Sequence, residues 1–410
     1  MHGNRGIHHF TDDDLRYRVP DVHYERSTNA VVYCVDRDTE YLSETGWKNI
    51  SEYEEGKIAQ YTTNGLIEFV TPVYVKNNYS GEFLSIKAQG IDQLLTPDHR
   101  VIYRNTVGQL KEMSAHELEE RHNKTSYGFR GKFITHFNYN GPGLQLSDDE
   151  IRLHIAFKAD GTYQRNNTTN RRAQFCFSKE RKIDRLISIL KRLSITYDIT
   201  EREDRRWIYF YTPSRIDKRF GSEWYKASNS QLGVISEEVL YWDGHVSQPR
   251  FWSSFKEDVD YIQFVWVTQG YGTNVFITEW NVWAVTRCSF SERSLTSKDP
   301  HNIVRTALDD GYCYCFNVPS GMLVFRRNNE IFVSGNCLMD RSGSMTTEKK
   351  FIAKAVCFWI VRFLRVKYTT VEVVFIAHDT EAEIVNERDF FDRSEGGGTR
   401  CSSAYTVALQ

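Results

Sequence analysis

Three residues, in a fixed order along the chain, could carry out acyl transfers on the protein's own backbone. The thiolate of Cys34 can attack the carbonyl group of the preceding residue, and the thiol of Cys337 can then take over the acyl group. The side-chain amide of Asn336, which directly precedes Cys337, can cyclise onto its own carbonyl and release the chain. Asn-Cys pairs are common, so these three residues alone do not distinguish such chemistry from a chance arrangement.

The segments that follow Cys34 and precede Asn336 are both predicted to be β structure. Residues 34–144 form short alternating runs separated by glycine- and asparagine-rich turns, a pattern typical of a compact all-β unit. The strand-like runs return near the other end, at residues 312–318, 322–326 and 330–333. We therefore expect one β unit whose two parts carry the two reactive ends.

The middle of the chain follows a longer hydrophobic period. Apolar residues recur at intervals of three and four over residues 178–193, which predicts an amphipathic helix. A shift of 76 residues matches this stretch to residues 254–266, so we expect two similar halves. Before each half, an apolar helical stretch ends in Asp-Gly, at Asp160 and at Asp243.

Composition limits the class of protein. The 410 residues suffice for two or three domains at about 100 to 200 residues each. No apolar run is long enough for a membrane span or a signal peptide, so we expect a cytoplasmic protein with no membrane partner and with its eight cysteines as free thiols. The net charge is only −2, but residues 165–206 hold twelve Lys or Arg against six Asp or Glu. Any affinity for nucleic acid must come from this local cluster.

Four sequence blocks in order resemble the splicing blocks of inteins. They span the 303 residues from Cys34 to Asn336. The blocks are Cys34–Ile50, Gly90–Arg100, Tyr314–Val318 and Phe332–Cys337. The resemblance implies an all-β Hint splicing domain that excises residues 34–336 and ligates Tyr33 to Cys337, with no cofactor.

The resemblance also implies roles for individual residues near the first bond. Cys34 performs an N-to-S acyl shift at its bond with Tyr33, while Thr96 and Asp98 hold the carbonyl and His99 protonates the leaving nitrogen. In the second and third steps, the thioester is transferred to the second cysteine and the terminal asparagine cyclises.

Three positions near the second bond depart from the intein pattern. Gly335 stands where the family often has His, and Met322 stands at another position where a His is expected. The group that assists cyclisation of Asn336 is therefore unassigned. Cys315 stands where many inteins have Asp, and it is either a proton donor or a small core residue.

The interrupting unit resembles the LAGLIDADG (DOD-type) homing endonucleases. The residues that carry the likeness are Leu153–Gly161 and the second copy that closes in Trp242–Gly244. The resemblance implies that Asp160 and Asp243 hold Mg²⁺ or Mn²⁺ at the scissile phosphates of double-stranded DNA, the host gene without the intein.

The basic cluster supplies candidate DNA contacts on the adjoining strands. These candidates are Arg171, Arg172, Arg205 and Arg206. Four other cations in the cluster are equally compatible with a solvated helix face. They are Lys182, Arg185, Lys191 and Arg192.

The flanking pieces, residues 1–33 and 337–410, resemble a von Willebrand factor A-like host domain of the bacterial YeaH/YhbH type. The likeness rests on an Asp-x-Ser-x-Ser motif and on a glycine-rich loop that ends in Thr. It implies a divalent-cation site after splicing, with ligands Asp340, Ser342, Ser344 and Thr399. The later strands of such a domain are absent, so we expect a fragment whose own protein partner is unknown.

Together these patterns predict a multidomain chain. An all-β Hint domain (34–144 and 291–336) is interrupted by an α+β endonuclease of two pseudo-symmetric halves (145–290), and pieces of an α/β, Rossmann-type host domain flank it. Two other interpretations remain: a metal-dependent von Willebrand factor A-like binding protein with an inactive insertion, and a Hint domain that cleaves without ligating.

Overall fold

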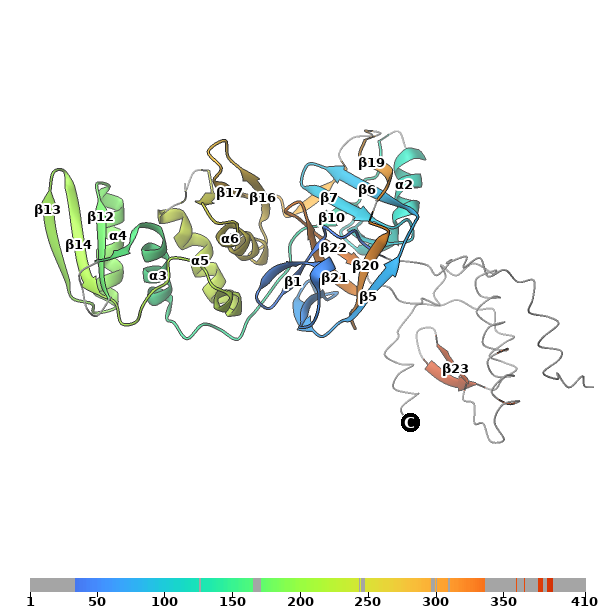
Figure 1. Cartoon of the computed structure of the whole chain (residues 1–410), viewed down its shortest axis with the longest axis horizontal. Coiled ribbons are helices and arrows are strands. Elements are labelled where there is room, and N and C mark those ends of the chain that lie inside the picture. The colour runs from blue at the N-terminus through green and yellow to red at the C-terminus, as the bar shows by residue number, and fades with distance from the viewer. Residues whose placement is uncertain are drawn as a thin grey trace, which may run out of the picture. The chain divides into compact units, whose positions relative to one another are not determined.

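The computed structural model describes residues 34–124, 127–164, 171–242, 244, 248–295, 299, 301–308, 310–335, 359, 365, 375–378 and 382–385. The chain divides into two compact units, Met1–Cys337 and Leu338–Gln410. In the second unit, β23 (Phe375–His378) and β24 (Ala382–Val385) form an antiparallel pair. The helices and strands described below belong to the first unit (Figure 1).

The largest sheet has ten strands, which come from both ends of the first unit. Its strand order is β18-β10-β8-β22-β21-β1-β3-β4, with β2 paired to β1 and β9 to β8. The strands are β1 (Glu40–Ser43), β2 (Gly46–Asn49), β3 (Ile58–Tyr61), β4 (Ile67–Val70), β8 (Arg100–Arg104), β9 (Leu110–Ser114), β10 (Lys132–Ile134), β18 (Glu292–Ser294), β21 (Met322–Arg327) and β22 (Glu330–Gly335). Because β21 and β22 lie between β8 and β1, the sheet joins the two predicted β segments in one core.

Two smaller sheets complete the β unit. One has the order β19-β6-β7, and the other pairs β20 with β5. Their bounds are β5 (Val73–Asn78), β6 (Glu82–Ala88), β7 (Ile91–Leu95), β19 (Ile303–Ala307) and β20 (Tyr312–Asn317). The short helix α2 (Ala115–Lys124) follows directly after β9.

A tight hairpin sets the register of the last strand. Asn328 and Asn329 connect β21 to β22 with φ of 46° and 69°, a left-handed conformation that asparagine tolerates better than most residues. The resulting pairing places Gly335 opposite Met322. Two of the three positions that depart from the intein pattern therefore lie side by side.

The middle of the chain forms two similar halves. The first contains α3 (Asp148–Asp160), β11 (Thr162–Tyr163), β12 (Arg172–Phe177), α4 (Glu180–Arg192), β13 (Tyr197–Arg202) and β14 (Arg205–Tyr211). The second contains α5 (Asn229–Trp242), β15 (Arg250–Ser253), α6 (Lys256–Thr268), β16 (Gly272–Ile277) and β17 (Trp283–Cys288). A shift of 76 residues carries the bounds of α4 onto those of α6. Helices α3 and α5 lie against each other between the two sheets (Figure 1).

Local sequence explains where α3 begins and ends. Ser147 and Glu150 form a reciprocal capping box, which satisfies backbone donors of the first turn. Gly161 follows the helix, and a Cβ there would lie 2.8 Å from the Cα of Phe157 and from the ring of Phe175. Glycine is therefore required where the chain leaves α3 and passes close to its own last turn.

The helical unit and the β unit share a continuous hydrophobic cluster. It includes Tyr61 and Phe137 from the β unit and Phe264 from α6. Gly46 in β2 leaves room for the ring of Tyr225, and Gly141 packs against the backbone of Ala227. The insertion is thus packed into the β unit rather than tethered to it.

Candidate functional site

Two hydrogen bonds hold the backbone of Cys34 against Thr96. The amide of Cys34 donates to Thr96 Oγ1 at 3.0 Å, and the amide of Thr96 donates to the carbonyl of Cys34 at 3.0 Å. Thr96 follows directly after β7, which is paired along its length with β6. The exposed fractions of Cys34 and Thr96 are 2% and 1%. The amide nitrogen that Thr96 contacts belongs to the peptide bond at which the sequence predicts the first reaction.

The side chain of Cys34 lies in a buried group of sulfur atoms. Val35 exchanges backbone hydrogen bonds with Tyr314 at 2.8 and 3.0 Å, which places Cys34 beside β20. There it packs with Cys313 and Cys315, which are 0% and 3% exposed. Hydrogen bonds to Cys313 and Cys315, together with burial, raise the pKa of the Cys34 thiol well above its ordinary value. Cys34 is therefore a neutral thiol until a base removes its proton.

His99 lies in the same turn as Thr96 and is also buried. Its amide donates to the carbonyl of Thr96 at 2.9 Å, and its Nε2 lies 2.5 Å from the hydroxyl of Ser334 in β22. Asp98, predicted to hold the carbonyl with Thr96, is exposed. Thr96 also provides the hydrogen bonds to the carbonyl of Cys34. The carbonyl that Thr96 and Asp98 are predicted to hold belongs to Tyr33, which lies outside the described residues, so this role stays a prediction.

The C-terminal end of the site has room for glycine alone. A Cβ on Gly335 would lie 2.6 Å from the Cβ of Arg100 and 3.3 Å from its carbonyl oxygen, much too close for a side chain. A larger side chain, including the His that the intein resemblance predicts here, does not fit at this position in the fold. Asn336 and Cys337 lie outside the described residues, so their predicted roles stay predictions.

Cys315 is compatible with both roles that the sequence left open. It is buried beside Cys34, as a small core residue would be. Its Sγ donates to the carbonyl of Phe316 at 3.4 Å. The thiol also lies in the same buried cluster as the thiol of Cys34, as a proton donor would.

Two lysines surround the end of α3. Asp160, the last residue of the helix, accepts a hydrogen bond from Lys182 Nζ at 2.5 Å. Lys218 donates to the carbonyls of Phe157 and Gly161 at 3.0 and 2.8 Å. Only 13% of the Lys182 side chain is exposed, so it does not belong to a solvated helix face. The sequence did not assign either lysine to this helix end. A hydrophobic period predicts the helix but does not show which acceptor a lysine contacts in the folded chain.

The other three cations of the cluster differ in their surroundings. Arg185 pairs with Glu238, a buried carboxylate on α5, and Arg192 donates to Asp149 at 2.9 Å. Lys191 is exposed. The helix-face interpretation therefore holds for Lys191 and fails for Arg185, which stacks over the ring of Tyr241 at 4.4 Å.

The donor atoms at the end of α3 suit a hard divalent ion, because the carboxylate of Asp160 is an oxygen ligand. No group of three His, Cys, Asp or Glu residues that could hold a metal ion occurs among the described residues. Asp243, the predicted second ligand, lies outside them, as do the predicted host ligands Asp340, Ser342, Ser344 and Thr399. These five ligands stay predictions.

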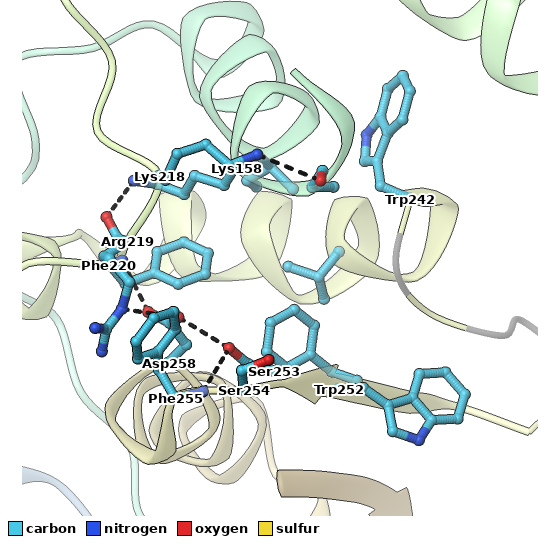
Figure 2. A pocket seen from close by; sticks show the side chains of 14 residues that line it. Lys158, Lys218, Arg219, Phe220, Trp242, Trp252, Ser253, Ser254, Phe255 and Asp258 are labelled. Carbon is cyan, nitrogen blue, oxygen red and sulfur yellow. Dashed lines mark hydrogen bonds and ion pairs between the residues drawn. The ribbon is translucent and has the colours of Figure 1, made fainter. Parts of the chain in front are cut away.

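A cavity of about 210 Å³ opens beside the same helix end (Figure 2). It lies between the ends of α3 and α5, strand β15 and the start of α6, with Lys158 and Phe220 on its wall. Lys158 Nζ donates to the carbonyls of Asp217 and Arg219 at 2.8 and 2.5 Å, and burial lowers its pKa to about 8. Arg219 pairs with Glu257 and Asp258. Lys158 and Arg219 are thus already paired with oxygen atoms of the protein, so this wall does not form an anion-binding site.

The first sheet has an open face opposite α4. Alternation along β12 and β14 buries residues such as Phe175 and Phe210 toward the helix. The opposite face carries Arg172, Gln174, Cys176, Arg205, Trp207, Tyr209 and Tyr211. The guanidinium of Arg172 lies 5.3 Å from the ring centroid of Tyr209.

The four predicted DNA-contacting arginines do not share one surface. Arg172 and Arg205 lie on the open face, whereas Arg206 points to the other side and donates to Glu180 and Glu201 at 2.7 Å each. Arg171 donates to the carbonyl of Pro213 at 2.9 Å, next to the sheet.

The second sheet has an open face of the same kind, which the sequence did not indicate. Arg250 in β15 lies 5.8 Å from the ring of Trp252 and 5.2 Å from the ring of Phe276. It donates to Thr286 in β17 at 3.0 Å. No charge cluster surrounds Arg250 in the sequence, so only the folded sheet shows its position.

Adjacent arginines in β21 fasten two different elements. Arg326 is fully buried and pairs with Glu40 at 2.7 Å and with Asp260 of α6 at 2.6 Å. Arg327 donates to Asp36, two residues after Cys34, at 3.0 Å. One strand therefore carries both the main charged contact with the inserted unit and the anchor of the reactive segment.

Comparison with known proteins identifies relatives of the C-terminal part. The profile of a family described as "Protein of unknown function (DUF444)" matches residues 328–410. The UPF0229 protein of Shouchella clausii is 58% identical over 73 residues, which cover 18% of this chain and 19% of the relative. A UPF0229 protein of Bacillus cereus is 47% identical over 93 residues, 22% of this chain and 24% of the relative. The chain thus spans about a fifth of the length of the curated relatives it matches.

Among solved structures, two kinds of protein show weak similarity. The AceL NrdHF class 3 split intein, in a splice-inactive variant, covers 75% of this chain and 100% of its own at 12% identity and a TM-score of 0.29. I-DmoI in complex with DNA and Mn covers 34% of this chain and 89% of its own at 10% identity and a TM-score of 0.27. Within the described part of the chain, no helix is long and apolar enough to cross a membrane.

Proposed function

We propose that residues 34–336 excise themselves and join Tyr33 to Cys337. The observation that carries this proposal is the buried contact between Cys34 and Thr96, which holds both sides of the cysteine's backbone at 3.0 Å. The Thr96 hydroxyl satisfies the buried amide of Cys34, as any buried N–H group requires. The same contact fixes the geometry of the peptide bond at that nitrogen, which is the bond that the proposed reaction breaks.

In the first step, Cys34 Sγ attacks the carbonyl carbon of Tyr33. The carbon–nitrogen bond breaks and a thioester forms, while the proton of the thiol is transferred through His99 to the leaving nitrogen, which becomes the free amine of Cys34. Thr96 keeps the Cys34 backbone in place while this occurs. The buried surroundings exclude water, which would otherwise hydrolyse the thioester.

Two further transfers complete the reaction. Cys337 Sγ attacks the thioester and releases the Cys34 thiol, so that Tyr33 is now bonded to Cys337. The side-chain nitrogen of Asn336 attacks its own carbonyl carbon, which breaks the bond to Cys337 and leaves a succinimide. The amine of Cys337 then attacks the Tyr33 thioester, and a peptide bond replaces it.

The splicing proposal is tested by the intact mass of the chain expressed under reducing conditions. By residue proportion, the 48.0 kDa chain should yield products of about 35.5 and 12.5 kDa. The matched control carries Cys34→Ala together with Asn336→Ala, and it should remain at full length. A parent chain that also remains at full length would favour the metal-dependent binding protein with an inert insertion.

We also propose that residues 145–290 cut double-stranded DNA. The supporting observation is the pair of halves, each with an open sheet face that combines an arginine with aromatic rings. Such faces can contact phosphates and base edges, and their pseudo-symmetry suits two half-sites. Asp160 would hold a divalent ion, which would stabilise the charge that develops at the phosphate.

Two lysines of the chain position the C-terminal end of α3 and the carboxylate of Asp160. Lys182 balances the charge of Asp160 and fixes its carboxylate. Lys218 occupies the C-terminal carbonyls of α3, where a cation is favourable. The test is cutting of the host gene without the insertion in the presence of Mg²⁺. A preparation that splices but leaves this DNA intact would remove the nuclease part of the proposal alone.

A further inference from the structure

We propose that Ser334 is the positioning residue for His99, and that it couples the first reaction to the strand that carries the last one. This inference deepens the proposed splicing function and rests on it. It concerns the orientation of a proton-transferring group, which neither the sequence blocks nor the relatives assign.

The contact between the two side chains is buried and short. Ser334 Oγ lies 2.5 Å from His99 Nε2, and each residue is 1% exposed. The residues are 235 positions apart in the chain: Ser334 lies in β22, and His99 directly precedes β8, the neighbouring strand of the ten-stranded sheet. The hydrogen bond to the carbonyl of Arg100 is enough to pair the buried Ser334 hydroxyl. The additional contact with Nε2 restrains the orientation of the imidazole ring.

The second contact of Ser334 determines which ring nitrogen exchanges a proton. Its hydroxyl donates to the carbonyl of Arg100 at 3.3 Å, and its oxygen therefore accepts from Nε2 of His99. Neutral His99 then has its hydrogen on Nε2, and Nδ1 is the atom that takes up and delivers the catalytic proton. The same bond supports the imidazolium, which must donate from both nitrogens.

The position of Ser334 links the two ends of the reaction. It lies in β22 next to Gly335, two residues before Asn336. Gly335 packs directly on Arg100, the residue that follows His99, so β22 is seated tightly at this point. The His99 ring is therefore held in its working orientation only while the strand that leads to Asn336 is in place.

An isosteric pair of variants isolates the hydroxyl group. Ser334→Thr retains it and Ser334→Val lacks it, while both add one methyl group to the same site. Each is made in a background with Asn336→Ala and Cys337→Ala, in which the first thioester can form but cannot proceed. The measurement is the rate at which dithiothreitol cleaves the bond between Tyr33 and Cys34.

The hydroxyl should decide the rate. General acid catalysis contributes about 10²- to 10⁴-fold, so loss of the ring's orientation in Ser334→Val should slow cleavage by at least about tenfold. Ser334→Thr should cleave within about threefold of the background. Equal rates for the two variants would overturn the proposal. If the Val chain does not fold, Ser334→Ala, which adds no atoms, replaces it.

Two controls separate a positioning role from a structural one. Ser43→Ala removes another buried hydroxyl of the same sheet, one that donates to the carbonyl of Gly46, and should leave the rate unchanged. In a Cys34→Ala background, cyclisation of Asn336 should slow less in Ser334→Val than the first step does. Equal slowing of both steps would mean that Ser334 merely supports the strand. A background chain that dithiothreitol does not cleave at all would overturn the splicing proposal itself.

Discussion

The β unit and the inserted helical unit present their reactive groups in opposite ways. In the β unit, Cys34, Thr96 and His99 are each at most 2% exposed. In the inserted unit, Asp160 is 26% exposed at a helix end, beside a cavity. The difference is the one that the two proposed functions require. A bond in the protein's own backbone would already lie inside the fold, whereas DNA would approach from solvent.

The comparison also shows how two units with different needs share one chain. The β sheet contributes Arg326, whose buried guanidinium pairs with Asp260 of the insertion. Asp260 has a lowered pKa, although burial alone would raise it, because Arg326 and Lys256 stabilise the carboxylate. This pairing holds the inserted unit against the sheet, and it does not touch the residues proposed to react.

The largest expected effect separates the two activities. Asp160→Asn removes the charge that would hold the metal ion, so DNA cutting in Mg²⁺ should fall to background, a loss of at least about a hundredfold. The yield of spliced product should be unchanged, because the site at Cys34 does not contact α3. Both activities are measured on the same preparation. Unchanged cutting would remove Asp160 from its proposed role.

The next largest effect is expected from a substitution that removes the ion pair between the β unit and the inserted unit. Arg326→Met removes the cation that Glu40 and Asp260 share and leaves Asp260 with Lys256 alone. Removing one partner of a buried pair costs about 3–5 kcal/mol. The free energy of unfolding in urea should fall by that amount. Arg206→Met removes a surface cation that is also paired twice, and it should change stability far less, because water screens exposed ion pairs. Equal effects of the two substitutions would mean that the interface is not held by the buried charge.

A smaller effect tests the open faces. Arg250→Ala and Arg172→Ala should each weaken binding to the cognate DNA by about 1–3 kcal/mol. Arg206→Ala should matter less, because Glu180 and Glu201 already occupy its guanidinium. Titration of labelled DNA at fixed salt measures all three. The same loss for Arg206 as for Arg250 would contradict the assignment of faces.

The smallest effect concerns the sulfur cluster. The hydrogen bond to Cys313 is the largest cause of the raised Cys34 pKa, so at neutral pH the thiolate is scarce and the first step should accelerate as pH rises. Cys313→Ala should lower this pKa and move the pH profile of dithiothreitol cleavage toward lower pH. Cys288→Ala, a cysteine of the inserted unit, is the matched control. A profile that does not move would show that Cys313 only fills space.

The sequence predicted features that depend on local pattern and missed those that depend on tertiary pairing. The repeat and its helix ends follow from hydrophobic period and from glycine, and Thr96 was placed near Cys34 by its sequence block. The contact between His99 and Ser334 joins residues 235 positions apart, and no local pattern signals it. Lys182 looked like part of a solvated face, because a charged residue on an amphipathic helix gives no sign of a buried partner. Arg250 was missed because no charged residues cluster around it in the sequence, and one of its aromatic neighbours, Phe276, comes close to it only across the folded sheet.

The central claim is that Tyr33 becomes joined to Cys337, and the most direct test is to sequence the junction by mass spectrometry. The smaller product should contain a peptide in which Val31-Val32-Tyr33 runs directly into Cys337-Leu338-Met339. The chain with Cys34→Ala and Asn336→Ala should lack this peptide. Free ends at Tyr33 and Cys337 without the joined peptide would contradict ligation and indicate a domain that only cleaves.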